Sequence, residues 1–341
     1  MSNWYLTEGP KADIAVSSRI RLARNLSGIP FPARMTNQQR TELNTKVKKA
    51  ILESNTPFSK SLKYIDMRDV PETQKYAMVE RHVISPEFAK LKGDSAVILS
   101  PDESISIMIG EEDHIRIQAL KPGLNLEEAL NEAEMVDAAI DDRIDYAYSE
   151  LYGHLTACPT NLGTGLRASV MLHLPALRMT RKIGKIIDVV NKVNINVRGV
   201  YGEGTEAIGD LFQVSNKVSL GLTNLEIINN VKAVVNKLIE HERQAREFLK
   251  ARGIEFEDKI CRDFGTLSCA KKLTYSEAEK LISMVKLGVA MGIVKDIDAQ
   301  KVSEINIISK PATLQKYAKE NLSGKELDIK RAELIQKIIK K

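Results

Sequence analysis

ACPTNLGTGLRAS, residues 157–169, places one thiol, one proline, two glycines and one arginine within thirteen positions. Cys158 stands before the proline, and Gly163 and Gly165 bracket a threonine shortly before Arg167. A lone cysteine is more often buried filler than a reactive group. Here, however, it lies beside a bend rich in hydroxyl and backbone N–H groups, which can stabilise a thiolate. The rest of the sequence must show whether this stretch is an ordinary turn or part of a functional site.

Short runs that alternate apolar and polar residues lie on both sides of this stretch, as in half-buried antiparallel strands. Helical stretches separate them. Asn125 and Glu128 are spaced as a helix start, and Pro175 stands where a strand gives way to a helix. The strand-like runs are DIAVSSRIRL, SAVILS, SISIMIG, HIRIQAL and SVMLHL, residues 13–22, 95–100, 104–110, 114–120 and 169–174.

From Thr223 onward the sequence is predicted to be helical. Thr223 and Glu226 form a capping box ahead of apolar residues at helical spacing, and that helix is expected to continue to Gly253. Ser276 with Glu279 is predicted to start a further helix.

This change of pattern predicts two domains, an α+β catalytic domain over residues 1–235 and an all-helical domain over residues 236–341. The second domain is expected to bind substrate or a partner, or to dimerise. It carries an apolar stripe that fits a homodimer face or, more commonly, the core of its own domain. The stripe consists of Ala278, Leu281, Ile282 and Val285.

Composition excludes several classes of protein. The 341 residues contain no run of eighteen apolar residues and no N-terminal signal peptide pattern, which predicts a protein that is neither secreted nor membrane-bound. Three cysteines without a CxxC pair fit a reducing cytoplasm, and the five histidines lack zinc-ligand spacing. A net charge of +5 is too small by itself to indicate nucleic-acid binding.

The run VSSRIRLAR, residues 16–24, places Arg19 and Arg21 on the same face of a strand, with Arg24 close by. Two arginines on one face repel each other unless an anion lies between them. The run therefore fits either a solvated edge strand or an arginine clamp on phosphate, in which the forked guanidinium groups bind pairs of oxygens.

Two further segments carry arginine together with acid. In IGEEDHIRI, residues 109–117, Glu112, His114 and Arg116 are predicted to share the face opposite the isoleucines, although an acidic hairpin tip is the ordinary interpretation. A carboxylate beside an arginine can act as a general base or hold a cationic substrate.

RGVYGEGTEAIGD, residues 198–210, is predicted to be a mobile loop that carries Arg198 and Glu203, either an ordinary surface loop or a lid over a substrate. The run matches neither a Walker A motif nor a dinucleotide-binding fingerprint. Many arginines without a nucleotide loop indicate a polyanion bound by side chains, and a triphosphate fits best. The glutamates would then face a cationic co-substrate. The arginines are Arg19, Arg21, Arg116, Arg167 and Arg198.

CPTNLGTGLR, residues 158–167, resembles the signature of the phosphagen (guanidino) kinases. SSRIR at 17–21, EEDHIR at 111–116 and RGVYGE at 198–203 resemble that family's other nucleotide and substrate blocks, in the same order. The resemblance implies an α+β fold like that of glutamine synthetase and the guanidino kinases, a curved antiparallel sheet flanked by helices. It also implies ATP with Mg²⁺ on the sheet, the metal being held by the phosphates and not by protein ligands.

Carried over by residue, the resemblance implies catalytic roles for Glu112, Glu203 and Cys158. The glutamates would grip the acceptor guanidinium and take its proton, and the Cys158 thiolate would position it without forming a covalent intermediate. The implied ATP-binding residues, with His82 placed on the short match ERH, are Ser17, Ser18, Arg19, Ile20, Arg21, His82, Arg116, Arg167, Ala168, Ser169, Val170, Met171, Arg198, Gly199, Val200, Tyr201 and Gly202.

Kinases of free guanidino metabolites carry a helical domain before the SSRIR-like strand, whereas only sixteen residues precede Ser17 here. The helical C-terminal half instead resembles the bacterial protein-arginine kinases of the family. An open pocket suits an arginine on a polypeptide better than a small ligand that depends on enclosure. The resemblance therefore implies a protein-arginine kinase of stress response and protein quality control, with an activator and a AAA+ unfoldase or protease as further partners.

The same relatives carry an RDxxRA motif that binds phosphoarginine allosterically. The corresponding stretch here is LDIKRA, residues 327–332, in which Asp328, Arg331 and Ala332 match and Leu327 replaces the first arginine. Because phosphate recognition needs that charge, we predict that this site does not work as it does in the family.

Two other functions fit parts of the pattern. A kinase of a free guanidino metabolite shares the chemistry but is expected to have the missing N-terminal cover. A basic adaptor or nucleic-acid-binding protein would place aromatic residues among the arginines for stacking. Aromatic residues make up only 5% of the chain, and none lies within residues 17–24 or 111–117, so direct nucleic-acid binding is not expected.

Overall fold

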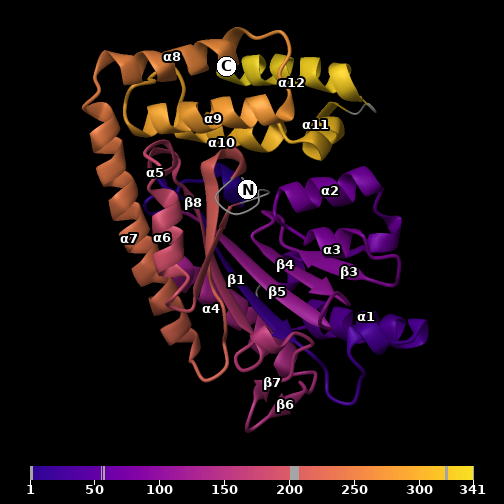
Figure 1. Cartoon of the computed structure of the whole chain (residues 1–341). Coiled ribbons are helices and arrows are strands. Elements are labelled where there is room, and N and C mark those ends of the chain that lie inside the picture. Colours follow the sequence, from indigo (N-terminus) through magenta and orange to yellow (C-terminus); the bar gives the residue numbers. More distant parts are fainter. Residues whose placement is uncertain (1–2, 55, 57, 200–206, 319–321, 341) are drawn as a thin grey trace.

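A computed structural model describes residues 3–54, 56, 58–199, 207–318 and 322–340 (Figure 1). These residues form an eight-stranded sheet in which every pair is antiparallel, in the order β2-β3-β4-β5-β1-β8-β10-β9. The strands are β1 Ala15–Arg24, β2 Lys63–Asp66, β3 Ala96–Leu99, β4 Ile105–Ile109, β5 Ile115–Pro122, β8 Leu166–His173, β9 Ile195–Gly199 and β10 Leu211–Asn216. A separate hairpin pairs β6 Tyr148–Ser149 with β7 Gly153–His154.

The five strand-like runs of the sequence are confirmed as β1, β3, β4, β5 and β8. The strands β2, β9 and β10 were not predicted. Arg198 and Gly199 were expected on a loop, which is wrong, because both belong to β9 and pair with β10. Val197 is buried on the sheet between the polar residues Asn196 and Arg198, so β9 alternates apolar and polar residues.

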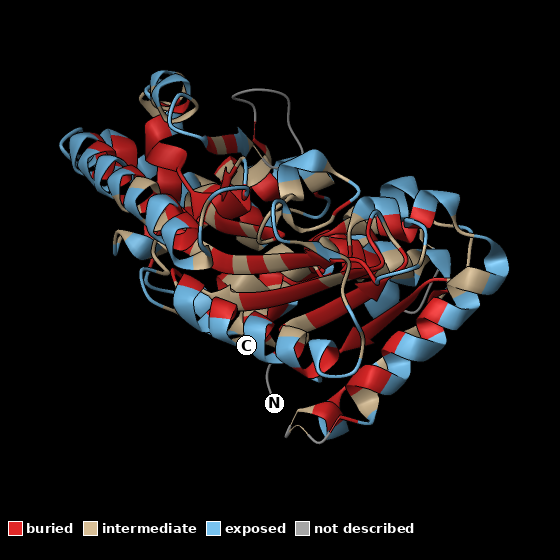
Figure 2. Ribbon diagram, turned by 90° about the horizontal axis from the view of Figure 1, so that it is seen from below, coloured by how far each residue is buried: buried red, intermediate tan, exposed pale blue. Residues whose placement is uncertain are grey.

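One face of the sheet is covered by α4 Leu126–Asp141 and α7 Asn224–Lys250. Their apolar residues pack on alternate residues of the central strands to form the larger core, which includes Ile20, Ile117 and Val170. Figure 2 shows each of these helices buried on its sheet side and exposed on its outer side. Further helices of the first half are α1 Asn37–Leu52, α5 Pro175–Met179 and α6 Ile183–Val190.

The other face of the sheet is covered only in part. The helices α2 Glu72–Glu80 and α3 Pro86–Ala89 close a smaller core over β3 and β4, with Met78, Phe88 and Met108 at its centre. The central strands β5, β1, β8 and β10 present polar and charged residues on this same face, as described below.

The C-terminal half is helical, as predicted. Its helices are α8 Ile254–Cys269, α9 Tyr275–Ala290, α10 Ala299–Ile308, α11 Pro311–Ala318 and α12 Gly324–Ile339. All four residues of the apolar stripe are buried, which supports their role in the core. The helix start at Ser276 is wrong, because Thr274 caps α9 and Ser276 lies inside it.

The capping box of Thr223 and Glu226 is confirmed at the start of α7. Asn125 is the N-cap residue of α4, but its side chain makes no capping bond to the backbone and donates to Glu128 instead. The Asn125 N–H donates to the Ser18 hydroxyl at 2.8 Å. The predicted boundary between residues 235 and 236 lies within α7, which continues without a break to Lys250. The division into two domains at that residue stays a prediction.

Glu80, at the end of α2, joins the two halves. Its carboxylate accepts from the Ala312 and Thr313 N–H groups at the start of α11, at 2.8 and 2.7 Å. The Lys310 ammonium donates to the Glu80 carbonyl at 2.8 Å. Among the described residues, no helix combines the length and the apolar character that crossing a bilayer requires.

Candidate active site

The strand register gathers the predicted arginines on the uncovered face of the sheet. Arg21 on β1 lies opposite Arg167 on β8, and Arg19 lies opposite Ser169. On the other side of β1, Ala23 lies opposite Arg116 of β5. Because cross-strand partners share a face, these arginines form one surface. We call it the polar face.

The polar face extends to the last two strands. Ser169 lies opposite Ser215 of β10, Met171 lies opposite Gln213, and Gln213 lies opposite Arg198 of β9. Arg198 therefore stands on the same surface as the other arginines, held by a strand and not by a loop. Gln213 and Ser215 complete this surface, and the sequence analysis missed both because it missed β10.

The guanidinium groups of the polar face are crowded and only partly satisfied. Arg167 donates to the Ser215 hydroxyl at 3.1 Å, and Arg19 donates to the Ser169 hydroxyl at 3.4 Å. The Nε atoms of Arg21 and Arg167 are buried without a hydrogen-bond partner among the described residues. Buried donors of this kind cost stability unless a ligand accepts from them.

Electrostatics confirm the crowding. Burial, followed by the charges of Arg19, Arg116 and Arg167, lowers the pKa of Arg21 well below its ordinary value. Burial and the nearby Arg198 and Arg116 likewise lower the pKa of Arg167. Each guanidinium charge therefore destabilises the charged form of its neighbours, and a bound polyanion would stabilise it instead.

The acidic tip between β4 and β5 contacts the edge of the polar face. Arg116 pairs with Glu111 at 2.5 Å and with Glu112 at 3.2 Å. Glu111 is nearly buried, whereas 45% of the Glu112 side chain is exposed. Burial raises the pKa of Glu112, and Asp113 and Glu111 add to this effect while Arg116 and Arg21 oppose it. Glu112 is thus the acid of this pair that is open to an incoming substrate.

Cys158 lies on the loop that leads into β8. It is partly buried, and its Sγ lies 3.1 Å from the Thr160 hydroxyl. Cys158 and Glu112 both raise the pKa of Arg167, so the thiol, the acid and the arginine share one electrostatic environment. The structure therefore brings together the predicted Cys158, Glu112 and Arg167.

Asp113 connects the acidic tip to the Cys158 loop, and the sequence analysis gave it no role. Its fully buried carboxylate accepts from the Ala157 N–H and from the Asn25 amide, both at 2.7 Å. Asn25 also accepts from the His114 N–H at 2.9 Å. Asp113 thus fixes the position of Cys158 relative to Glu112. A third acid directly after the acidic pair is the only sequence signal for it.

The glycines of the Cys158 loop allow a close approach of backbones. Gly163 has φ +103°, and a Cβ there would lie 2.8 Å from the Leu220 Cα. Gly165 has φ +66°, and its Cβ would lie 2.6 Å from the Ala23 carbonyl oxygen on β1. Any side chain at either position would displace the loop that holds Cys158.

The strand alternation places the side chains of four predicted ATP-binding residues away from the polar face. Ser18, Ile20, Ala168 and Val170 lie on the helix-covered face and are fully buried there. The Ser18 hydroxyl donates to the Gly123 carbonyl at 2.9 Å. Their side chains therefore do not reach the polar face, and their contact with ATP stays a prediction.

His82 lies at the edge of the polar face, whereas His114 is buried away from it. His82 has φ +62° and lines a cavity together with Ser17 and Met171, at the edge of the polar face. Burial and the charges of Lys310 and Arg19 hold its pKa well below the ordinary value, which keeps the ring neutral. His114 was expected to share a face with Arg116. Instead it is fully buried, and its Nδ1 accepts from the Leu26 N–H at 2.9 Å.

Four predicted residues lie outside the residues that the structure describes. They are Val200, Tyr201, Gly202 and Glu203.

Two protein-family models match this chain. Residues 42–245 match the family model of the ATP:guanido phosphotransferase C-terminal catalytic domain, and residues 253–341 match the McsB C-terminal domain of protein-arginine kinase. The chain belongs to the ATP:guanido phosphotransferase family. The family match covers β5, β8, β9 and β10, that is, every strand of the polar face except β1.

Curated relatives of this phosphotransferase extend over its whole length. "Protein-arginine kinase" of Halothermothrix orenii is 48% identical, with 98% of this chain and 96% of the relative covered. "Protein-arginine kinase" of Bacillus subtilis is 42% identical, with 98% and 93% covered. The chain is similar to both through the sheet and the helical domain alike.

Solved structures share the fold of this phosphotransferase. A duplicated taurocyamine kinase from Schistosoma mansoni with bound transition-state analog components aligns with a TM-score of 0.62 and 29% identity, covering 69% of this chain and 34% of that chain. Lombricine kinase aligns with a TM-score of 0.59 and 24% identity, covering 68% and 67%. The predicted fold class is confirmed by these alignments and by the sheet itself.

The RDxxRA-like stretch of this phosphotransferase lies on α12. Arg331 is 1% exposed and donates to the Ser309 and Leu273 carbonyls, at 2.8 and 2.7 Å, and to Asp328 at 2.7 Å. Ala332 is buried beside it. The guanidinium is therefore committed to the chain's own acceptors. That Leu327 prevents the phosphoarginine binding of the family stays a prediction.

The polar face of this phosphotransferase fits ATP, because Arg21 and Arg167 retain buried donors that a phosphate could satisfy. Among the described residues, no group of three or more histidines, cysteines or acids is placed to hold a metal ion. That Mg²⁺ is held through phosphate oxygens stays a prediction.

Proposed function

We propose that this chain transfers the γ-phosphoryl group of ATP to arginine side chains of proteins, forming phosphoarginine. The observation that carries the proposal is the polar face, where Arg21 and Arg167 keep unused buried donors beside Glu112 and Cys158. Full-length similarity to proteins named protein-arginine kinase supports the choice of acceptor.

The arginines of the polar face would hold the triphosphate. Arg19, Arg21 and Arg167 come from adjacent strands, so their spacing is set by the sheet and not by flexible loops. Arg116 and Arg198 would close the set from the two sides. ATP would supply the phosphoryl group, and Mg²⁺ held through its phosphates would neutralise charge there. Rigid, preorganised charge of this kind is the main contribution that a protein makes to phosphoryl transfer.

Glu112 would accept the proton of the acceptor guanidinium, which is too basic to attack while protonated. Its pKa is raised by burial, which makes its carboxylate a stronger base. Glu203 would be the second acid of the pair, as the sequence predicts. Cys158 would contact the guanidinium and orient it, with Asp113 fixing the loop on which the thiol stands.

The acceptor is proposed to be a polypeptide because the family resemblance extends into the helical domain, where residues 253–341 match the C-terminal domain of protein-arginine kinase. That domain would bind the substrate protein, a partner or a second copy of the chain as a homodimer. An activator protein, a AAA+ unfoldase or protease, a role in stress response and a cytoplasmic location are proposals that rest on the family resemblance alone.

The direct test is incubation of the full chain with ATP-Mg²⁺ and an unfolded protein, followed by mass spectrometry under conditions that preserve acid-labile P–N bonds. We expect phosphoarginine on the unfolded protein and little on free arginine. Preferential phosphorylation of the free amino acid would indicate a metabolite kinase instead. No phosphoarginine on either acceptor would contradict the proposal.

Glu112→Gln tests the base. The variant removes the proton acceptor but keeps the shape of the side chain, so we expect the rate to fall roughly 10²- to 10⁴-fold while ATP affinity changes little. Glu240→Gln, an exposed acid on α7, is the matched control and should leave both quantities unchanged. Near-normal activity of Glu112→Gln would show that another group takes the proton.

Cys158→Ser tests the thiol. We expect a lower rate and an altered pH dependence of the rate, because a serine hydroxyl does not ionise in the working range. Cys261→Ser, an exposed thiol on α8, serves as the control. Mass spectrometry of the intact chain should find no covalent phosphoryl adduct on Cys158, and such an adduct would refute the positioning role.

A further inference from the structure

The polar face changes in character along β1 and β8. At one end Arg21 lies opposite Arg167, and at the other end Ser17 lies opposite Met171, with Arg19 between the two ends on β1. Alternate residues of a strand are about 7 Å apart, so the face passes from paired arginines to uncharged side chains over about 13 Å. A ligand that joins a charged tail to an uncharged ring system fits a face that changes in this way.

The two groups that would handle the acceptor lie at the arginine end of this face. Glu112 pairs with Arg116 at 3.2 Å, and Arg116 lies opposite Ala23 near the end of β1. The loop that carries Cys158 leads into the start of β8 at the same end. The transferred phosphoryl group would therefore lie at the arginine end, and the nucleoside of ATP would extend toward Ser17.

A cavity of about 300 Å³ lies at the Ser17 end, between the two halves of the molecule. Ser17, His82 and Met171 line it, so the cavity continues the candidate ATP site, whereas neither Glu112 nor Cys158 lines it. The helices α9 and α10 form the opposite wall. The volume corresponds to the smaller ligand pockets of proteins. A nucleoside in this place would have the sheet on one side and the helical half on the other.

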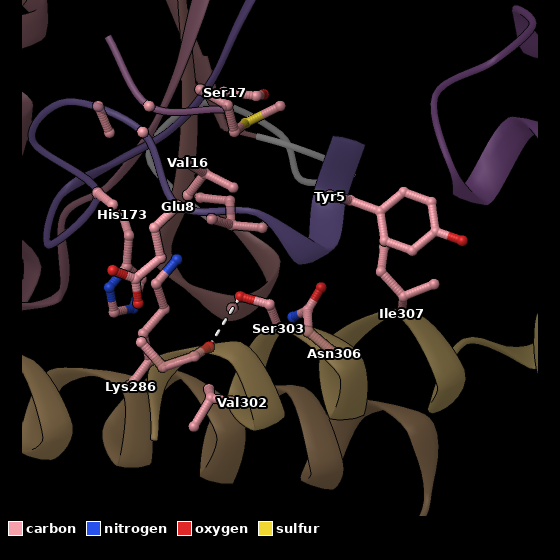
Figure 3. Close-up of a pocket in the computed structure, with 18 of the residues that line it drawn as sticks. Tyr5, Glu8, Val16, Ser17, His173, Lys286, Val302, Ser303, Asn306 and Ile307 are labelled. Atoms are coloured by element: carbon pink, nitrogen blue, oxygen red, sulfur yellow. Dashed lines mark hydrogen bonds between the residues drawn. The ribbon is translucent and has the colours of Figure 1, made fainter. Parts of the chain in front are cut away.

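Two polar side chains of α10 project into this cavity. Figure 3 shows Ser303 and Asn306 across the cavity from Val16 and Ser17. The Ser303 hydroxyl donates to the Ala299 carbonyl at 3.0 Å, so its oxygen can still accept a hydrogen bond. The Asn306 amide is partly buried and makes no hydrogen bond to any residue that the structure describes. The cavity wall thus offers one acceptor and one complete amide to a ligand.

An asparagine amide matches one edge of adenine. The amide has an NH₂ donor beside an oxygen acceptor, and the N6 and N7 positions of adenine present a donor beside an acceptor. Guanine presents two acceptors, O6 and N7, at the corresponding positions. The amide oxygen would then face an acceptor, so an amide in this place would favour adenine over guanine.

We propose that α10 forms one side of the nucleoside site, where the Asn306 amide hydrogen-bonds the adenine base and the Ser303 oxygen accepts from the nucleoside. The inference rests on the proposed use of ATP and adds a contribution from the helical half. The helix α10 lies within residues 253–341, which match the McsB C-terminal domain, and outside residues 42–245, which match the catalytic domain. One ATP molecule would thus contact both halves of the chain.

The test compares ATP-Mg²⁺ with tripolyphosphate-Mg²⁺, which has the phosphates without the nucleoside, by calorimetric titration of the full chain. We expect Asn306→Leu to weaken ATP roughly fivefold or more, as for the loss of one or two hydrogen bonds, and to change tripolyphosphate less than about twofold. Gln300→Leu, which removes an exposed amide of α10 that does not line the cavity, is the matched control and should change neither affinity. Equal ATP affinity of Asn306→Leu and the unaltered chain would overturn the proposal. Equal weakening of both ligands would also overturn it, because the loss would not involve the nucleoside.

The choice of base is tested with GTP-Mg²⁺. The unaltered chain should bind ATP more tightly than GTP, and Asn306→Leu should lose most of this preference. A preference that the variant keeps would overturn the assignment of the amide to the base. Ser303→Ala should weaken ATP alone, and circular dichroism melting checks that each variant is folded. Failure of the unaltered chain to bind ATP would contradict the proposed function itself, whereas ATP binding that the α10 variants leave unchanged would overturn this inference alone.

Discussion

Two regions of this molecule bury arginine, and they do so in opposite ways. On the polar face, Arg21 and Arg167 lie opposite each other, each with a buried Nε that has no partner in the part of the chain that the structure describes. On α12, Arg331 is more deeply buried, yet its Nε and Nη1 donate to Ser309, Leu273 and Asp328.

The contrast distinguishes arginines with donors left for a ligand from an arginine whose donors stabilise the packing of its own domain. A guanidinium whose donors reach backbone carbonyls and one acid stabilises the packing around it. A guanidinium that faces other guanidinium groups destabilises the fold until an anion arrives. Arginine in the sequence does not reveal which case applies, but the hydrogen-bond partners do.

Arg167→Met should give the largest change. Removing one charge from the polar face is expected to lower kcat/KM for ATP by roughly 10³-fold or more, as for other arginines that stabilise a transferring phosphoryl group. The melting temperature should stay the same or rise, because repulsion of Arg198 and Arg116 is relieved. Steady-state kinetics and calorimetry measure the two effects. A strong loss of stability would mean that Arg167 is structural, like Arg331.

Arg331→Met should show the reverse. The variant leaves two carbonyls and Asp328 without their donor in a buried place, so the free energy of unfolding is expected to fall by about 3–5 kcal/mol. Urea denaturation measures this loss. Arg262→Met, which removes an exposed arginine of α8, should cost less than about 1 kcal/mol. If Arg331→Met were as stable as the control, the contacts of Arg331 would not hold the domain together.

Glu279→Gln should give a smaller effect that depends on pH. Glu279 is 2% exposed, and burial raises its pKa to about 7, partly opposed by Lys310 and Arg331 and reinforced by Glu80. The folded state thus holds a proton that the unfolded state releases above about pH 4.5. Stability should fall as pH rises from about 4.5 to 7, by at most about 1.4 kcal/mol per pH unit.

The Gln variant has no proton to lose at this position. Its stability relative to the unaltered chain should therefore increase as the pH is raised over the same range. Urea denaturation at pH 5, 6 and 7 measures this trend. Identical pH profiles for the two chains would show that Glu279 titrates normally.

Much of the sheet could be predicted because its central strands alternate clearly. In β1 the alternate residues Val16, Ser18, Ile20 and Leu22 are apolar or small, and in β5 the same holds for Ile115, Ile117 and Ala119. The strand β9 was missed because a glycine-rich run follows directly, and that composition favours a loop. The start of α9 was misplaced by two residues because Thr274 and Ser276 are both good caps, and only the packing distinguishes them.

The candidate site could be predicted in its residues but not in their orientation. The signature and the arginine blocks named Arg19, Arg21 and Arg167 correctly as neighbours. They also included Ile20 and Ala168, because a contiguous block ignores the two faces of a strand. The role of Asp113 could not be predicted from its place after the acidic pair, because that role depends on where the Ala157 backbone lies in the folded chain.

The alternation of β1 has a consequence for how this sequence can change over evolutionary time. Ser17, Arg19 and Arg21 lie on the polar face, where we propose that ATP binds, whereas Ser18, Ile20 and Leu22 lie in the core. Two independent demands therefore alternate within six residues. Substitutions can satisfy each demand separately. A one-residue insertion or deletion cannot, because it would exchange the two sets and drive both arginines beneath α4. The residues of this strand can be substituted one by one, but its length and its alternation between the two faces cannot change.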